Sequence, residues 1–253
     1  MRPIRVFVRC CVLFLSLSVA SPAAWPSDIE SRSVFLPSAG VTAELFAAPG
    51  EARRPAVIIL HGRQGIDPLR RHYQHYAAAV AKSGIDAYLL PYYTGGDARL
   101  AQNPIAEERR AYFGQRLRLW STLVRSAVDD ILAEHHASGQ IGLLGFSQGG
   151  FLSVAAANQD PRISAMTIFY GGIPSVLKDN ITHLPPILEL HGDADHTVPL
   201  PEGKALVDVA HGLNSSVEMV VYPGAGHGFS GASAADAERR TIAFFQQRLL
   251  VKP

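Results

Sequence analysis

A serine between two glycines, placed directly after an apolar strand, constrains the fold of this chain more than any other sequence feature. Residues 141–144 predict a buried strand, and Gly145-Phe146-Ser147-Gln148-Gly149 follows at once and opens a predicted helix. In so sharp a turn, side chains two residues either side of the serine would collide with neighbouring backbone. The hydroxyl of Ser147 would stand above a sheet, beside the backbone N–H of Gln148. A serine that only caps a helix has the same local pattern.

Apolar runs that predict strands alternate with helix patterns along the rest of the chain. Strands are expected at residues 33–36, 41–47, 55–60, 86–90, 141–144, 163–169, 187–190 and 217–222, and helices at 72–82, 105–136, 149–158, 202–211 and 234–250. This order predicts an α/β fold with a mostly parallel central sheet and helices on both faces. Neither a repeat nor a linker interrupts the chain, so a single domain is expected over residues 25–253.

A reactive serine needs a base to take its proton and a carboxylate to orient that base. In a parallel sheet these groups belong at the carboxyl ends of later strands. The strand at 187–190 runs into Asp193 and Asp195, and the strand at 217–222 is followed by a glycine-rich loop that contains His227. We expect His227 to be the base. We expect Asp195 to be the acid and Asp193 to shape the turn, although both carboxylates are within reach.

The loop after the strand at 55–60 is expected to supply a second hydrogen-bond donor for an oxyanion, beside that of Gln148. The N–H of Arg63 is the first choice in this loop and that of Gln64 the second. Three aromatic residues are expected in the substrate pocket: Tyr92, Tyr93 and Phe146. The two tyrosines fit surface packing equally well. No metal site is expected, because His72 and His75 lie three apart on a helix without a third ligand.

The first 24 residues resemble an export signal. Three arginines precede the apolar stretch 10–20, and Ser18 and Ala20 fit a cleavage pair. An uncleaved membrane anchor is the alternative, although the stretch is short for a span. Both cysteines of the chain, Cys10 and Cys11, lie in this segment, so an exported mature protein would contain neither a disulfide nor a thiol nucleophile. We expect a periplasmic or secreted protein without stable membrane association.

The charge of the chain argues against nucleic acid as a partner. Its formal net charge is +1 and its pI about 7.9, which provides no broad electropositive surface. No glycine-rich phosphate loop follows a strand, and no nucleotide fingerprint is present, so no cofactor is expected. A small-molecule ester or lactone is the partner that the serine chemistry implies.

From Pro55 onward the chain resembles the dienelactone hydrolase family of the α/β-hydrolase superfamily. The resemblance rests on separated blocks: Leu89-Leu90-Pro91-Tyr92-Tyr93, Gly142-Leu143-Leu144-Gly145-Phe146-Ser147-Gln148-Gly149-Gly150, Phe169-Tyr170-Gly171, His191-Gly192-Asp193-Ala194-Asp195-His196-Thr197-Val198-Pro199 and Tyr222-Pro223-Gly224-Ala225-Gly226-His227-Gly228-Phe229. It implies an α/β-hydrolase fold without a large cap domain, carboxylic-ester hydrolysis, and Ser147, Asp195 and His227 as the triad. A binding protein on a decayed hydrolase fold, a peptidase and an acyltransferase remain alternatives.

The chain departs from the family pattern in three ways. The best-known members of the family use a cysteine where this chain has Ser147. They also carry a glutamate near the position of the loop 61–65, and this loop has no acidic residue in the present chain. Family members also hold the carboxylate of dienelactone with two arginines, whose places fall at about Gly95 and Gly231 in this chain. Neutral short-chain esters are therefore expected to be better substrates than dienelactone, unless other arginines substitute. The nearby ones are Arg63, Arg70 and Arg99.

Overall fold

The computed structural model of the protein describes residues 29–50 and 52–250. The expected export signal and both cysteines lie outside the described residues. Within the described ranges, no helix has both the length and the apolar character needed to cross a membrane.

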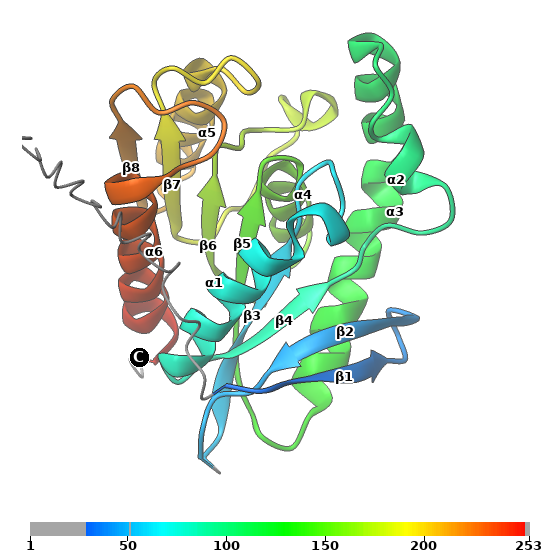
Figure 1. The fold of residues 1–253 in the computed structure, drawn as a ribbon, viewed down its shortest axis with the longest axis vertical. Coiled ribbons are helices and arrows are strands. Elements are labelled where there is room, and N and C mark those ends of the chain that lie inside the picture. The colour runs from blue at the N-terminus through cyan, green and yellow to red at the C-terminus, as the bar shows by residue number, and fades with distance from the viewer. Residues whose placement is uncertain (1–28, 51, 251–253) are drawn as a thin grey trace, which may run out of the picture.

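Eight strands form one twisted sheet in the order β1-β2-β4-β3-β5-β6-β7-β8 (Figure 1). The strands are β1 (Ser31–Leu36), β2 (Val41–Phe46), β3 (Arg54–Leu60), β4 (Asp86–Leu90), β5 (Ala137–Phe146), β6 (Ile163–Phe169), β7 (Ile187–Gly192) and β8 (Val217–Tyr222). β2 pairs antiparallel with β1 and β4, and all the other pairs are parallel. The predicted mostly parallel sheet is confirmed. The central strands β3, β4 and β7 are buried at nearly every position, because helices cover both faces.

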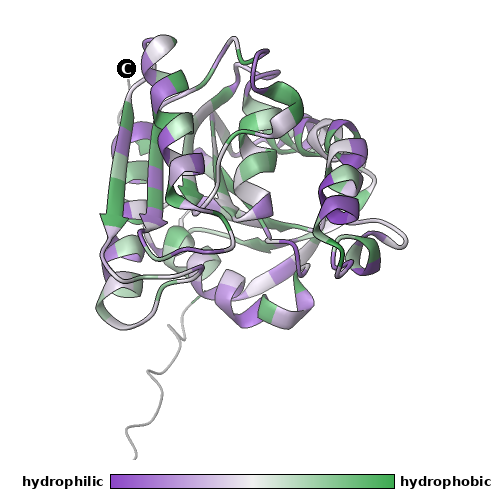
Figure 2. Cartoon of the chain, turned by 90° about the horizontal axis from the view of Figure 1, so that it is seen from above, coloured by the Kyte–Doolittle hydropathy of each residue, from purple (hydrophilic) through white to green (hydrophobic). Residues whose placement is uncertain are grey.

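Helices cover both faces of the sheet, and the sheet separates the core into two clusters. The helices are α1 (Arg70–Lys82), α2 (Asp97–Leu100), α3 (Ala106–Ala133), α4 (Gln148–Ala157), α5 (Leu200–Gly212) and α6 (Gly231–Phe245), with short 3-10 turns at Asp67–Leu69 and Ser175–Leu177 and a π-helical turn at Gln246–Leu250. One cluster contains buried residues of α3, α4 and α5, and the other contains those of α1 and α6. The helices carry both hydrophilic and hydrophobic residues along their length (Figure 2).

The connection order brings the predicted functional loops together at one edge of the sheet. From β3 the chain crosses to β4 on one side, whereas β5 lies on the other side of β3. The loops after β3 and β5 therefore diverge at the point where the strand order reverses, which is where ligands bind in open α/β sheets. The loops after β6, β7 and β8 follow along the same edge because these strands are parallel to β5.

Two predicted boundaries differ from the structure around α3. The helix ends at Ala133, not at residue 136, and β5 begins at Ala137, four residues before its apolar core. The strand begins early because its first residue pairs with β3. Ala137 is held against Arg54 of β3 before a bulge restores the main register, so polar residues enter the strand ahead of Ile141.

Candidate active site

The turn after β5 has the strained geometry expected of the Gly-x-Ser-x-Gly pentapeptide. Ser147 lies at φ 52° and ψ −117°, a conformation that L-residues rarely adopt. The two flanking glycines are required by close backbone contacts. A Cβ on Gly145 would lie 2.5 Å from the carbonyl oxygen of Gly149, and one on Gly149 would lie 2.1 Å from that of Leu60. α4 therefore packs directly against the end of β3, with the serine at the top of the turn.

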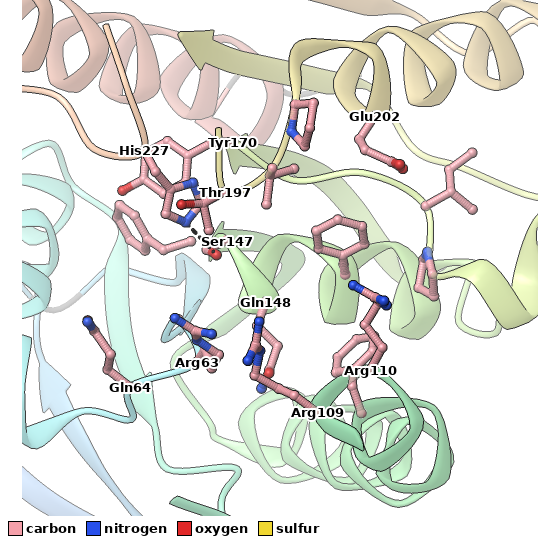
Figure 3. Close-up of a pocket in the computed structure, with 18 of the residues that line it drawn as sticks. Arg63, Gln64, Arg109, Arg110, Ser147, Gln148, Tyr170, Thr197, Glu202 and His227 are labelled. Atoms are coloured by element: carbon pink, nitrogen blue, oxygen red, sulfur yellow. Dashed lines mark hydrogen bonds between the residues drawn. The ribbon is translucent and has the colours of Figure 1, made fainter. Parts of the chain in front are cut away.

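The structure brings Ser147, His227 and Asp195 into one hydrogen-bonded row. Figure 3 shows the side chains of Ser147 and His227 pointing toward each other. Nε2 of His227 is 2.8 Å from Oγ of Ser147, and Nδ1 is 2.7 Å from Oδ2 of Asp195. The other carboxylate oxygen, Oδ1, accepts the backbone N–H groups of Thr197 and Val198 at 2.8 and 2.9 Å. Asp195 is buried at 4% exposure. These bonds leave one oxygen free to orient the imidazole.

The competing carboxylate lies in a different place. Oδ1 of Asp193 accepts the N–H of Gly224 at 2.6 Å, so it joins the loop after β7 to the loop after β8. The two loops pack so closely that a Cβ on Gly192 would lie 2.1 Å from the carbonyl oxygen of Ala225. Asp193 thus shapes the loops on which Asp195 and His227 stand, and the geometry does not bring it to the imidazole.

The sequence predicts two backbone N–H groups as donors to an oxyanion. That of Gln148 stands at the start of α4, and that of Arg63 lies in the loop after β3. Neither is engaged by another group in the described part of the chain. The neighbouring donor is already used, because the N–H of Gly62 donates to the hydroxyl of Tyr73 at 2.9 Å. Free donors converging near a nucleophile are what stabilisation of a tetrahedral oxyanion requires.

Tyr92 and Tyr93 fasten this loop instead of lining the pocket. The hydroxyl of Tyr93 donates to the carbonyl oxygen of Arg63 at 2.9 Å, and that of Tyr92 donates to the carbonyl oxygen of His61 at 2.7 Å. The side-chain amide of Gln148 donates to both hydroxyls, at 2.7 and 3.2 Å. The network ties the loop after β3 to the first residue of α4. Of the three aromatic residues expected in the pocket, only Phe146 lines the cavity.

Replacing Tyr93 by Phe should lower kcat about two- to tenfold, because one hydrogen bond that positions Arg63 is lost, at a cost of about 0.5–1.5 kcal/mol. KM should change little. Steady-state kinetics on a chromogenic ester measures both constants. The matched control is Tyr88→Phe, which removes a buried hydroxyl from β4 away from this network. Equal kcat values for the two variants would show that the network does not support catalysis.

His61 is buried behind the loop and does not compete with His227 as a base. Its ring stacks on that of Tyr92 with centroids 3.9 Å apart, and its Nδ1 lies 2.8 Å from the carbonyl oxygen of Gly62. Burial lowers the pKa of His61 to about 4, and the contact with Gly62 opposes that shift only in part. The imidazole is therefore neutral near neutral pH and serves as a fixed wall for the loop.

A cavity of about 480 Å³ opens in front of Ser147. The elements at the carboxyl edge and the first turns of α3 contribute its lining residues, which include Gly62, Arg63, Gln64, Leu69, His72, Tyr73, Arg109, Arg110, Phe113, Phe146, Ser147, Gln148, Phe151, Tyr170, Ile173, Pro174, Ser175, Lys178, Thr197, Val198, Pro199, Glu202 and His227. The ring of Tyr170 lies against that of His227, with centroids 4.6 Å apart. The size suits a small molecule.

Positive side chains gather on the wall across from His227 (Figure 3). Arg63, Arg109, Arg110 and Lys178 all line the cavity, against the single carboxylate of Glu202. Burial, and then the nearby charges of Arg63 and Arg110, lower the pKa of Arg109. Neither Arg63 nor Arg110 forms an ion pair within the described residues. Of the three arginines considered from the sequence, Arg63 alone lines the cavity. Arg109 and Arg110 were missed, because they belong to none of the sequence motifs.

A group of possible metal ligands lies far from this site. Ligand atoms of Glu134, His135 and His136 come within 4.8 Å of one another at the start of β5. Ser147 follows the opposite end of that ten-residue strand, about 30 Å away at the usual rise per residue. These residues therefore have no part in the cavity.

Comparisons with known proteins point to one family and one fold. A model of the dienelactone hydrolase family matches residues 42–249. A relative from Escherichia coli is 30% identical over 122 residues, but the match spans only 42% of this chain and 45% of that relative. The carboxymethylenebutenolidase of Pseudomonas putida is 24% identical over 214 residues, 81% of this chain and 88% of its own length. The crystal structure of dienelactone hydrolase from Anabaena variabilis superposes with a TM-score of 0.68 at 21% identity, covering 87% of this chain and 99% of that one.

Proposed function

The chain belongs to the dienelactone hydrolase family, and from that premise we propose that it is a serine hydrolase that cleaves carboxylic esters or lactones. The observation that carries the proposal is the unbroken row of hydrogen bonds from Ser147 through His227 to Asp195, beside two unengaged backbone N–H groups. This is the set of groups that acyl transfer needs.

The reaction would proceed in two halves through an acyl-enzyme. Oγ of Ser147 attacks the ester carbonyl as Nε2 of His227 takes its proton, and the oxyanion accepts the N–H groups of Gln148 and Arg63. When the C–O bond to the alcohol breaks, Nε2 returns the proton to the leaving oxygen. Water then attacks the acyl group with His227 again as base, and Ser147 leaves with the proton. Throughout, Asp195 holds the tautomer whose Nε2 is free to accept.

Turnover of an aryl acetate and labelling by a fluorophosphonate test the proposal together. We expect hydrolysis of the ester, and loss of that activity in proportion to the covalent label on the protein. A binding protein on the same fold would show neither turnover nor label. A peptidase would cleave amide substrates faster than matched esters, and an acyltransferase would pass the acyl group to an added alcohol faster than to water.

We further propose that the preferred substrate carries an anionic group. Arg63, Arg109 and Arg110 face the cavity in which Ser147 lies, and they outnumber its single carboxylate. Gly95 and Gly231, at the places of the two family arginines, are absent from the lining. The anionic group would therefore be held from α3 and the loop after β3. This reverses the preference for neutral esters expected from those two glycines. The name of the Pseudomonas relative likewise describes a lactone with a carboxymethylene group.

Arg109→Ala and Arg110→Ala should each lower kcat/KM about tenfold or more for an aryl monoester of succinate, because a hydrogen bond to a charged group contributes about 1.5–3 kcal/mol. The matched aryl butyrate should change little. The control is Arg118→Ala, on an exposed face of the same helix. A similar loss on both esters, or better turnover of butyrate by the unaltered protein, would contradict an anion-binding wall.

Export to the periplasm or the medium remains a proposal that rests on residues 1–24. The mature protein isolated from its producing cell should begin between about Ser21 and Asp28, since cleavage follows small residues after the apolar stretch. N-terminal sequencing measures this. A mature protein that retains Cys10 and Cys11 would support a membrane anchor instead.

A further inference from the structure

Two ionisable side chains lie fully buried beneath the loop that carries Asp195, and the reaction above does not use them. Glu189 and His191 are two positions apart on β7, so their side chains leave the same face of the sheet. Both are 0% exposed. Nδ1 of His191 is 2.8 Å from Oε1 of Glu189, and that oxygen also accepts the N–H of Gly171 at 3.3 Å. A buried pair of this kind is costly unless its hydrogen bonds are made.

The second ring nitrogen of His191 reaches the turn that holds Asp195. Nε2 is 2.9 Å from the carbonyl oxygen of Val198, whose own N–H donates to Oδ1 of Asp195 at 2.9 Å. The same nitrogen is 3.9 Å from Oδ2 of Asp195, the oxygen that bonds His227. The imidazole thus fixes the far end of the turn and faces the charge of the triad acid.

Each ring nitrogen faces an oxygen, so either the ring carries a proton on both nitrogens beside a Glu189 carboxylate, or the ring is neutral and the proton lies on Glu189, whose pKa burial raises. A neutral imidazole has only one N–H. Burial by itself would lower the pKa of His191, but the hydrogen bonds to Glu189 and Val198 outweigh it and raise that pKa above its ordinary value. The charged groups that face the ring are Glu189 and Asp195. Gly203 of α5 lies against the ring, and a Cβ there would lie 2.6 Å from Nδ1, so the helix packs closely over the pair.

We propose that Glu189 and His191 are positioning residues for Asp195, with the protonated imidazole holding the 195–198 turn in the geometry that orients His227. The inference rests on the proposed function, since it assigns a role in the same reaction. If the second ring proton were lost, only one ring nitrogen could donate a hydrogen bond. Either the carbonyl of Val198 would then lose its donor, or Nδ1 would face the Glu189 carboxylate without a proton between them. Either change loosens the turn that presents Asp195.

His191→Gln should lower kcat about 10- to 100-fold while KM stays within about threefold, because a misplaced acid affects the chemical step more than substrate binding. Glu189→Gln should also lower kcat, but by less than His191→Gln does. In Glu189→Gln a neutral imidazole can still donate from Nε2 to Val198 and accept the glutamine amide at Nδ1. The control is His136→Gln, which breaks another histidine–carboxylate contact, 3.3 Å from Asp86, at the far edge of the sheet.

Ring ¹⁵N NMR reports the proton directly and does not depend on a folded His191 variant. Followed over pH, the ring ¹⁵N shifts of His191 in the unaltered protein should give a pKa above the ordinary histidine value, and Glu189→Gln should lower that pKa. A His191 pKa at or below the ordinary histidine value in the unaltered protein would overturn the inference, as would a kcat of His191→Gln equal to that of His136→Gln. Fluorophosphonate labelling distinguishes failure of the proposed hydrolase function from failure of the positioning role alone. A parent protein that is not labelled would contradict the proposed function. A parent protein that is labelled but gives either of the overturning results would contradict only the positioning role.

Discussion

Ser147→Ala is expected to abolish ester hydrolysis, with a loss of about 10⁶-fold in kcat, because no other group in the cavity can form the acyl bond under the proposed mechanism. The fold should be unaffected. The elbow is held by contacts of Gly145 and Gly149, and the serine side chain bonds only His227. Thermal unfolding and steady-state kinetics on one preparation measure both quantities.

The matched control for this variant is Ser175→Ala, which removes another serine hydroxyl from the same cavity wall. We expect its kcat to stay within about twofold, as is usual for a surface hydroxyl without a buried partner. More than a few per cent of activity left in Ser147→Ala would show that a different group is the nucleophile. An equal loss in both variants would instead indicate damage to the cavity.

Asp195→Asn should lower kcat by about 10⁴-fold through the tautomer of His227. The N–H groups of Thr197 and Val198 bond one carboxylate oxygen, so an asparagine would keep its oxygen there and turn its amino group toward Nδ1. A donor facing Nδ1 moves the imidazole proton to Nε2, which then cannot accept the proton of Ser147. The measurement is kcat of Asp195→Asn as a function of pH, compared with kcat of the unaltered protein at the same pH values.

Asp193→Asn is the matched comparison, since it alters a carboxylate two residues away. An asparagine oxygen can still accept the N–H of Gly224, so kcat should remain within about threefold. If Asp193→Asn proved the more damaging substitution, the acid of the triad would have been assigned to the wrong carboxylate.

The fold could be predicted from the sequence wherever local chemistry and topology agree. The run at 55–60 is apolar at every position because β3 is buried on both faces. The glycines around Ser147 likewise reflect backbone contacts within the elbow itself. Asp195 and His227 could be chosen because strands in a parallel sheet end at one edge, and the structure places His227 beside Ser147 and Asp195 beside His227. Their catalytic roles remain predictions.

The cavity wall could not be predicted in the same way. Arg109 and Arg110 reach the site because α3 is long enough to extend past the sheet, and nothing local marks them. Tyr92 and Tyr93 lie at a strand end, where ligands often bind, yet their hydroxyls face inward and bond the loop after β3. Glu189 and His191 belong to a strand whose other residues are apolar or glycine, and their partners outside the strand, Gly171 and Val198, reach them only in the folded chain.

Mass spectrometry of the protein quenched in acid during turnover of an aryl ester tests the central claim most directly. We expect a covalent acyl adduct in the steady state, located by peptide mapping on Ser147 and absent from Ser147→Ala. Turnover that proceeds without an adduct on Ser147, or with the acyl group on another residue, would contradict the account.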